Sequence, residues 1–165
     1  AASYQFYRST KKDGDYQHIK TIDSVGTSSW TDSSVKTGKT YYYKIKTVVK
    51  TQNGEQTNGF SNVKSAKAVP AKTTLKAKAS DAKNVKLTWS KVKGASGYEI
   101  YRSNSKDGKY SKVKTISKGS TTSYKNGKLK KSTTYYYKIR AYRKVNGKKV
   151  YGSYSSVVSV KTKAK

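Results

Sequence analysis

The sequence Thr-Tyr-Tyr-Tyr-Lys-Ile occurs twice in this chain, at residues 40–45 and again 94 positions later at residues 134–139. The same offset aligns Tyr-Arg-Ser at residues 7–9 with Tyr-Arg-Ser at residues 101–103. A single period that recurs along most of a chain indicates two copies of one structural unit. The copies join near Pro70, which interrupts the pattern and suits a short linker or a strand edge. We therefore expect two domains, residues 1–68 and residues 69–165.

The second copy alternates apolar and polar residues, which is typical of half-buried strands. Leu75, Ala77 and Ala79 alternate with lysines. Further strands are predicted at residues 85–89, 98–100, 110–116, 121–125, 134–145 and 150–162. The pairs Asp107-Gly108 and Asn146-Gly147 suit tight hairpins, because these residue types tolerate positive φ. About seven short strands at this spacing favour an all-β fold with two packed sheets.

Particular residues of the second copy resemble the fibronectin type III pattern. They are Trp89 on the second predicted strand, the Gly-Tyr-Glu-Ile-Tyr-Arg run at residues 97–102, and Leu129 six positions before Tyr135. The resemblance implies two tandem immunoglobulin-like β-sandwiches in which this tyrosine closes the corner before the sixth strand. Tyr41, six positions after Val35, matches the same corner in the first copy. The structural core implied by the resemblance is Trp89, Tyr98, Leu129, Tyr135 and Tyr41.

The first copy departs from the pattern at its beginning. The counterpart of residues 70–94, which holds the first two strands, would precede residue 1, so the first sandwich is expected to lack those strands. A sandwich without them exposes strand edges and an apolar trough. Three explanations stay open: the sequence is a fragment of a longer protein, another chain supplies the strands, or the trough packs elsewhere.

Composition limits the chemistry. The chain has no Cys and one His, which excludes thiolate metal sites and disulfides. His18 is expected to be a surface strand residue. The eight carboxylates are scattered, with Asp13 and Asp107 in turns and Glu99 at an outward strand position. No nucleophile elbow or phosphate loop occurs. We expect no enzyme activity, no cofactor and no metal site.

The positive charge is uneven. Residues 1–68 carry 11 Lys and Arg against 5 acidic residues, whereas residues 69–165 carry 26 against 3. Such a field attracts anionic polymers such as teichoic acid, anionic glycans or, without specificity, nucleic acid. The N-terminus shows no basic and apolar segments of a signal peptide, and no apolar run is long enough for a membrane span.

The alternation of inward and outward side chains along a strand predicts an exposed stripe of rings and cations on the sixth strand and its neighbour. If Tyr135, Tyr137 and Ile139 point inward, the residues between them point outward. The candidate surface for an anionic polymer is Tyr101, Tyr136, Lys138, Arg140 and Tyr142 in the second copy, and Tyr7, Tyr42, Lys44 and Lys46 in the first. Rings stack on sugars while cations meet phosphates or carboxylates. The alternative is that these side chains form cross-strand pairs that stabilise the sheet.

Other lysines are expected to form a solvated coat with little selectivity for anions. They include Lys76, Lys78, Lys86, Lys91, Lys93, Lys144, Lys148 and Lys149.

The resemblance is to tandem repeats of secreted and cell-surface proteins of Gram-positive bacteria. It implies an extracellular or cell-wall-associated spacer or adhesion module that binds anionic envelope or matrix polymers, or other surface proteins. The alternative function is a subunit of a surface fibre or oligomer, in which another chain donates strands to the incomplete first repeat.

Overall fold

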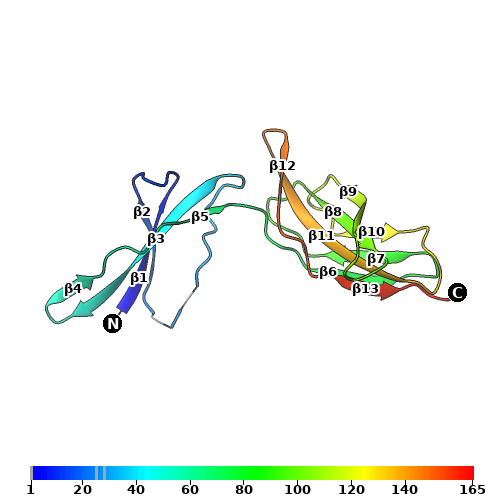
Figure 1. Cartoon of the computed structure of the whole chain (residues 1–165), viewed down its shortest axis with the longest axis horizontal. Coiled ribbons are helices and arrows are strands. Elements are labelled where there is room, and N and C mark those ends of the chain that lie inside the picture. Colours follow the sequence, from blue (N-terminus) through cyan, green and yellow to red (C-terminus); the bar gives the residue numbers. More distant parts are fainter. Residues whose placement is uncertain (1, 25, 28) are drawn as a thin grey trace. The chain divides into compact units, whose positions relative to one another are not determined.

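The computed structural model describes residues 2–24, 26–27 and 29–165, which form strands and no helix; none of these residues therefore lies in a helix able to cross a membrane. The chain divides into two compact units, Ala1–Ala68 and Val69–Lys165. Figure 1 shows the strands of both units, and each unit is described by itself below.

The second unit is a complete sandwich of two antiparallel sheets. One sheet has three strands in the order β10-β7-β6, and the other has the order β12-β11-β8-β9, with β13 also paired to β11. The strands are β6 (Leu75–Ala79), β7 (Val85–Trp89), β8 (Gly97–Ser103), β9 (Ser111–Ile116), β10 (Ser123–Asn126), β11 (Thr134–Val145), β12 (Lys148–Tyr151) and β13 (Val158–Lys161). The all-β sandwich predicted from the sequence is confirmed.

The single strand predicted at residues 150–162 is wrong, because the chain forms β12 and β13 with an irregular stretch between them. Gly152 begins that stretch and leaves no room for a side chain, since an added Cβ would collide with the carbonyl oxygen of Pro70. The irregular stretch still bonds to β11. Gly152 N donates to Ala141 O at 2.9 Å, and Ser155 N donates to Ile139 O at 2.7 Å.

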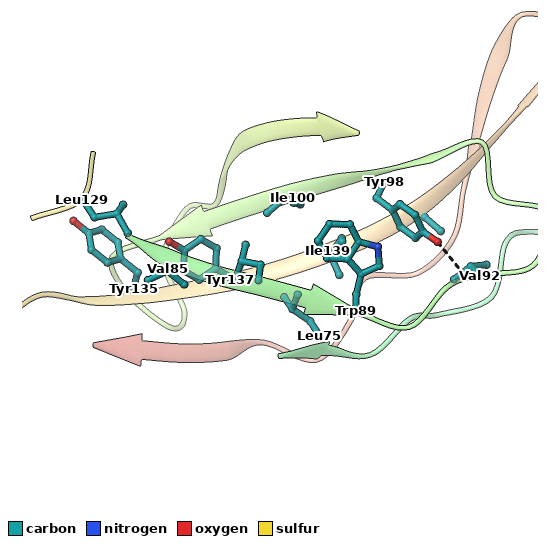
Figure 2. Close-up of a cluster of buried hydrophobic side chains, with 12 residues drawn as sticks. Leu75, Val85, Trp89, Val92, Tyr98, Ile100, Leu129, Tyr135, Tyr137 and Ile139 are labelled. Atoms are coloured by element: carbon teal, nitrogen blue, oxygen red, sulfur yellow. Dashed lines mark hydrogen bonds between the residues drawn. The ribbon is translucent and has the colours of Figure 1, made fainter. Parts of the chain in front are cut away.

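The core of this unit lies between its two sheets. Val85, Leu87 and Trp89 alternate inward on β7 and meet Ile100 and Ile139, and all five side chains are buried. Figure 2 shows Trp89 beside Tyr98, and the ring centroids of this pair lie 5.4 Å apart. Burial of side chains of this size stabilises the folded state by about 1.5–3 kcal/mol each. The five residues expected in the core, including Leu129, Tyr135 and Tyr41, are all buried.

A tyrosine closes the same corner in both units. The Tyr135 hydroxyl accepts a hydrogen bond from Lys130 N at 3.0 Å, and the Tyr41 hydroxyl accepts one from Lys36 N at 3.0 Å. Because a buried hydroxyl without a partner is costly, this bond sets the path of the chain as it enters β11 and its counterpart β3 (Thr40–Thr51).

Of the two predicted hairpin turns, only one adopts positive φ. Asn146 and Gly147 have φ of 49° and 76°, as the turn between β11 and β12 requires. Asp107 and Gly108 do lie in the connection between the antiparallel strands β8 and β9, as expected, but the connection is longer than a tight turn and neither residue adopts positive φ. A side chain supports that turn instead, because Ser105 N donates to Ser103 Oγ at 3.2 Å.

The first unit has one sheet. Its order is β2-β1-β3-β4, with β5 also paired to β3, and it matches the five-stranded sheet of the second unit strand by strand. The strands are β1 (Ala2–Ser9), β2 (Gln17–Ile22), β3 (Thr40–Thr51), β4 (Gly54–Thr57) and β5 (Lys64–Lys67).

The first unit forms no second sheet within its described residues. The missing counterparts of β6 and β7 were expected. The counterpart of β10, at residues 29–32, is also not a strand, which the sequence did not predict. The reason is that β10 pairs only with β7 in the second unit. Without a β7 counterpart, residues 29–32 have no backbone partner that would make them extended.

The two units should respond differently to the same truncation. Replacing Ile139, which is fully buried, with Ala should lower the free energy of unfolding of the second unit by about 2–5 kcal/mol, because a cavity replaces packed atoms. Ile45 lies at the equivalent position but is only half-buried, so Ile45→Ala should cost the first unit much less. Hydrogen exchange resolved by peptide across a urea series reads both units. Equal losses of unfolding free energy in the two units would contradict this account of the packing.

Candidate binding surface

The outer face of the five-stranded sheet in the second unit carries rings and cations that contact one another. Lys138 Nζ lies 4.3 Å from the ring centroid of Tyr110 and 4.5 Å from that of Tyr154. The Arg140 guanidinium lies 3.7 Å from the ring centroid of Tyr151. Tyr101, Tyr136, Lys138 and Arg140 are all half-buried. Cation–π pairs of this kind each contribute about 0.5–2 kcal/mol.

A buried carboxylate lies beneath this layer. The Glu99 side chain is 1% exposed and accepts hydrogen bonds from Arg140 Nη2 at 2.9 Å and Lys149 Nζ at 2.9 Å. Lys112 Nζ lies 3.5 Å away. The hydroxyls of Tyr101 and Tyr151 donate to it at 2.7 and 3.2 Å. One buried negative charge is thus compensated by three cations and two hydroxyls.

The electrostatics of Glu99 follow from these contacts. Burial raises the pKa of this carboxyl, but hydrogen bonds from Lys149, Tyr101 and Arg140 lower it more, and the pKa falls to about 2. Glu99 is therefore ionised at neutral pH. The hydrogen bond to Glu99 in turn raises the pKa of Lys149.

Glu99 is the residue that sequence reasoning missed. It was assigned an ordinary outward position, although β8 pairs with β11 so that Glu99 lies directly opposite Arg140. Aligning those two predicted strands in register would have revealed the ion pair. The expectation that Lys149 belongs to a solvated coat is wrong for the same reason, since its side chain is 29% exposed and holds Glu99.

The expectation that Tyr142 lies exposed on the stripe is also wrong, since it is 1% exposed. Its ring fills the space opposite Gly97, where an added Cβ would lie 2.6 Å from the Tyr142 hydroxyl. The hydroxyl donates to Ile116 O at 3.2 Å, and Lys149 Nζ lies 4.5 Å from the ring centroid. The alternation of residues along β11 predicted the correct face of the sheet for Tyr142. It could not show that Gly97, opposite Tyr142 on β8, leaves room for the tyrosine ring.

The equivalent face of the first unit has cations and rings, and its described residues place no buried carboxylate beneath them. Lys44 Nζ lies 4.3 Å from the ring centroid of Tyr16 and 4.0 Å from that of Phe60. Lys46 Nζ lies 5.5 Å from the ring centroid of Tyr7. Gln5 takes the place of Glu99, and the Tyr7 hydroxyl donates to its Oε1 at 2.9 Å. Within the described residues no carboxylate pairs with Lys44 or Lys46, and Tyr42 is half-buried beside them.

A second cationic feature lies on the outer face of the three-stranded sheet. Lys86 on β7 lies directly opposite Lys78 on β6 and directly opposite Lys125 on β10, and all three side chains are exposed. We call these three residues the lysine row. Neighbouring strands are about 4.8 Å apart, and like charges in opposed positions destabilise a sheet. None of the three has a salt-bridge partner in the part of the chain that the structure describes.

His18 and Asp32 each contact neighbouring side chains. His18 is exposed, and its Nε2 lies 3.0 Å from Thr21 Oγ1. Asp32 lies in a loop, where Arg8 Nη1 donates a hydrogen bond to it at 2.6 Å. Among residues 2–24, 26–27 and 29–165, no three His, Cys, Asp or Glu side chains are close enough together to hold a metal ion.

No known protein family and no curated protein matches the sequence of this chain. Solved structures do match. The FN1–FN3 domains of chicken CNTN1 superpose with a TM-score of 0.50 at 18% identity, covering 98% of this chain and 56% of that one. The chain thus spans little more than half of that structure, and this likeness shows the fold alone. A Fn3-like protein from Clostridium thermocellum has 30% identity and a TM-score of 0.45, over 56% of this chain and 88% of its own.

The Glu99 network makes the stability of the second unit sensitive to acid. Because folding lowers this pKa from 4.5 to about 2, the carboxylate contributes stability above its ordinary pKa. We expect a contribution of about 2–3 kcal/mol that is lost as the pH falls from about 5.5 toward 2. Glu99→Gln should therefore destabilise the second unit at pH 7 and have little effect near pH 2. The equivalent residue of the first unit is Gln5, which indicates that a glutamine side chain fits at position 99.

Urea unfolding, monitored through the fluorescence of Trp89 in a Trp30→Phe background, measures the effect of Glu99→Gln on the free energy of unfolding of the second unit. Asp107→Asn is the matched control, because Asp107 is an exposed carboxylate of the same unit and forms no salt bridge among the described residues. It should change stability little at either pH. An equal loss for Glu99→Gln at pH 7 and pH 2 would show that the charge of Glu99 contributes nothing.

Proposed function

Since this chain has the fibronectin type III fold, we propose that it is a non-catalytic extracellular spacer and adhesion module that binds anionic polymers of the cell envelope or matrix. The polymers are of the teichoic acid or anionic glycan class. Cell-wall or cell-surface location in a Gram-positive bacterium is part of the proposal. Other modules of this fold generally have no enzyme activity, and no cofactor is involved.

The observation that carries the proposal is the lysine row. Three like charges in opposed positions cost stability in the free protein, since the sheet alone gains nothing from their placement. A polymer with regularly spaced phosphates or carboxylates would remove that repulsion. It would also release its counterions, as nucleic acids do on binding cationic proteins.

The distribution of charge supports the same function. The second unit carries 26 of the 37 Lys and Arg residues and only 3 acidic residues. Charges more than about 8 Å apart are screened at physiological salt, so binding would depend on neighbouring lysines such as those of the row. Lys76, exposed on β6 two positions before Lys78, extends the cationic surface.

The stripe of rings and cations contributes unequally to polymer binding in the two units. In the second unit Glu99 already neutralises part of the charge of Arg140 and Lys149, so that stripe is chiefly structural. In the first unit Lys44 and Lys46 have aromatic neighbours and, among the residues that the structure describes, no carboxylate partner, which suits an anionic sugar better.

A second candidate function is a subunit of a surface fibre or oligomer. It is favoured by the inner face of the first unit, which no second sheet covers within the described residues. It predicts a solution mass above 18.3 kDa that survives high salt. Association that salt abolishes would favour the adhesion module instead.

Neutralising the lysine row should weaken polymer binding. The triple variant Lys78→Gln, Lys86→Gln, Lys125→Gln should bind poly(glycerol phosphate) about tenfold or more weakly at low salt, since each lysine near an anionic surface contributes about 1 kcal/mol. The same variant should unfold at a higher urea concentration, because the opposed charges are gone. Titration calorimetry over a salt series measures the affinity and its salt slope.

The matched control removes the same charge elsewhere. Lys91, Lys93 and Lys118 are exposed outside the strands, and their replacement by Gln gives the same net charge. This control should lose less affinity and gain no stability. If both triple variants weaken binding equally, the lysine row is not a specific binding site, and the polymer is attracted by the net charge alone. Double-stranded DNA of equal phosphate concentration tests whether the binding prefers the polymer to nucleic acid.

A further inference from the structure

A hollow lined by cationic residues lies at one end of the second unit. Figure 2 shows Tyr135 and Leu129 at this end of the core. The hollow has a volume of about 630 Å³, and its wall includes Tyr135, Arg102 on β8, and Lys128 and Lys130 in the loop between β10 and β11. None of the three acidic residues of the second unit lines it. Three cations therefore surround this space without a carboxylate from the same unit.

The equivalent arginine of the first unit has acceptors of its own. Arg8 Nη1 donates to Asp32 Oδ2 at 2.6 Å and to Ser34 Oγ at 2.7 Å. The other oxygen of the carboxylate, Asp32 Oδ1, accepts hydrogen bonds from N and Oγ of Ser34 at 2.9 and 2.7 Å. In that unit an internal carboxylate and a hydroxyl satisfy the guanidinium.

The second unit lacks both of these acceptors. Asn126 stands at the position of Asp32, and Lys128 stands at the position of Ser34. Arg102 Nη1 donates to Asn126 Oδ1 at 3.2 Å, and this neutral oxygen also accepts a hydrogen bond from the Tyr137 hydroxyl at 2.8 Å. Among the described residues Arg102 has no salt-bridge partner. An amide and a second cation thus replace the acceptors that the first unit provides.

The loop between β10 and β11 holds side chains where the backbone favours glycine. Lys128 and Ser132 have φ of 58° and 51°, in the left-handed region that L residues seldom adopt. The counterpart of Ser132 in the first unit is Gly38, whose φ is 89°. Residues in such conformations are concentrated at functional sites, and both Lys128 and Ser132 line the hollow.

The acid at this end of the unit is already engaged. Lys163 N donates to Asp81 O at 3.4 Å, while Ser132 N donates to Lys163 O at 3.1 Å, so Asp81 and Ser132 belong to the same end. The Asp81 carboxylate accepts hydrogen bonds from Lys83 N at 2.8 Å and from Asn84 Nδ2 at 2.8 and 2.9 Å. It does not line the hollow, so the cations there keep their charge for a ligand.

We infer that this hollow is a binding site for a phosphate group. The guanidinium of Arg102 is a planar fork that matches two phosphate oxygens, and its carbon lies 5.1 Å from the ring centroid of Tyr135 in the wall. Lys128 and Lys130 add positive charge, which attracts a doubly charged phosphate more strongly than a singly charged carboxylate. The site is separate from the lysine row and does not require that the row bind a polymer.

The test uses inorganic phosphate as the probe and the full chain as the protein. Phosphate replaces chloride at constant ionic strength, and NMR follows the amide signals of residues 127–134 and the Nε–H signal of Arg102. The double variant Asn126→Asp, Lys128→Ser gives the second unit the acceptors of the first. The matched control, Asn146→Asp with Lys148→Ser, makes the same two changes at exposed positions beyond the other end of β11.

The expected result is a set of saturable shifts at residues 127–134 and at Arg102. The double variant should bind phosphate about tenfold or more weakly, because the introduced carboxylate occupies the guanidinium and one cation is gone. Lys128→Ser alone changes an exposed side chain and should weaken binding by about threefold or more. The control should bind like the unaltered chain. The inference is overturned if the double variant and the control bind alike, or if acetate binds as tightly as phosphate.

Two further ligands distinguish the source of the phosphate. Glycerol phosphate and poly(glycerol phosphate) are compared at equal phosphate concentration. Tighter binding of the polymer at the same residues assigns the phosphate to a polymer chain, and equal or weaker binding assigns it to a small phosphate ester. The lysine-row variant keeps every residue of the hollow and should bind inorganic phosphate unchanged, so failure of the row and failure of this site are distinguishable.

Discussion

The packing of β7 against the opposite sheet is the interaction on which this fold depends. Its inward side chains fill the core, and its backbone is also the partner that makes β10 a strand. The described residues of the first unit contain no counterpart of β7. The five-stranded sheet persists there, with its corner tyrosine bonded as in the second unit, but its inner side chains stay half-exposed and the third strand of the opposite sheet does not form. One strand thus supports both layers.

The outer faces of the two units follow a different rule. In the second unit, Glu99 is buried because Arg140, Lys149 and two tyrosine hydroxyls are all within reach of it. In the first unit, a neutral glutamine takes that place and the lysines rest on rings alone. The same strand register therefore gives an ionic network around Glu99 in one copy, whereas in the other copy Lys44 and Lys46 have no carboxylate partner among the described residues.

Much of the fold could be predicted from the sequence, because inward positions repeat and their chemistry is simple. The repeat of 94 residues, the alternation in β6 and β7, and the corner tyrosines all follow from one-dimensional patterns. Glu99 and Tyr142 could not be assigned in that way. Their burial depends on what lies across the strand, Arg140 in one case and Gly97 in the other, and alternation along a single strand carries no such information. The lysine row was likewise hidden in an apparently uniform coat until strand register aligned its members.

The Glu99 network also constrains how two copies of one ancestral repeat could diverge. A carboxylate at this buried position is tolerated only after its cations are in place, since an isolated buried charge costs several kcal/mol. The first unit has Lys46 and Glu55 where the second has Arg140 and Lys149, so a glutamate at position 5 would lack one cation and lie near another acid. A glutamate at this position is therefore stable only where the basic residues that pair with it are also present.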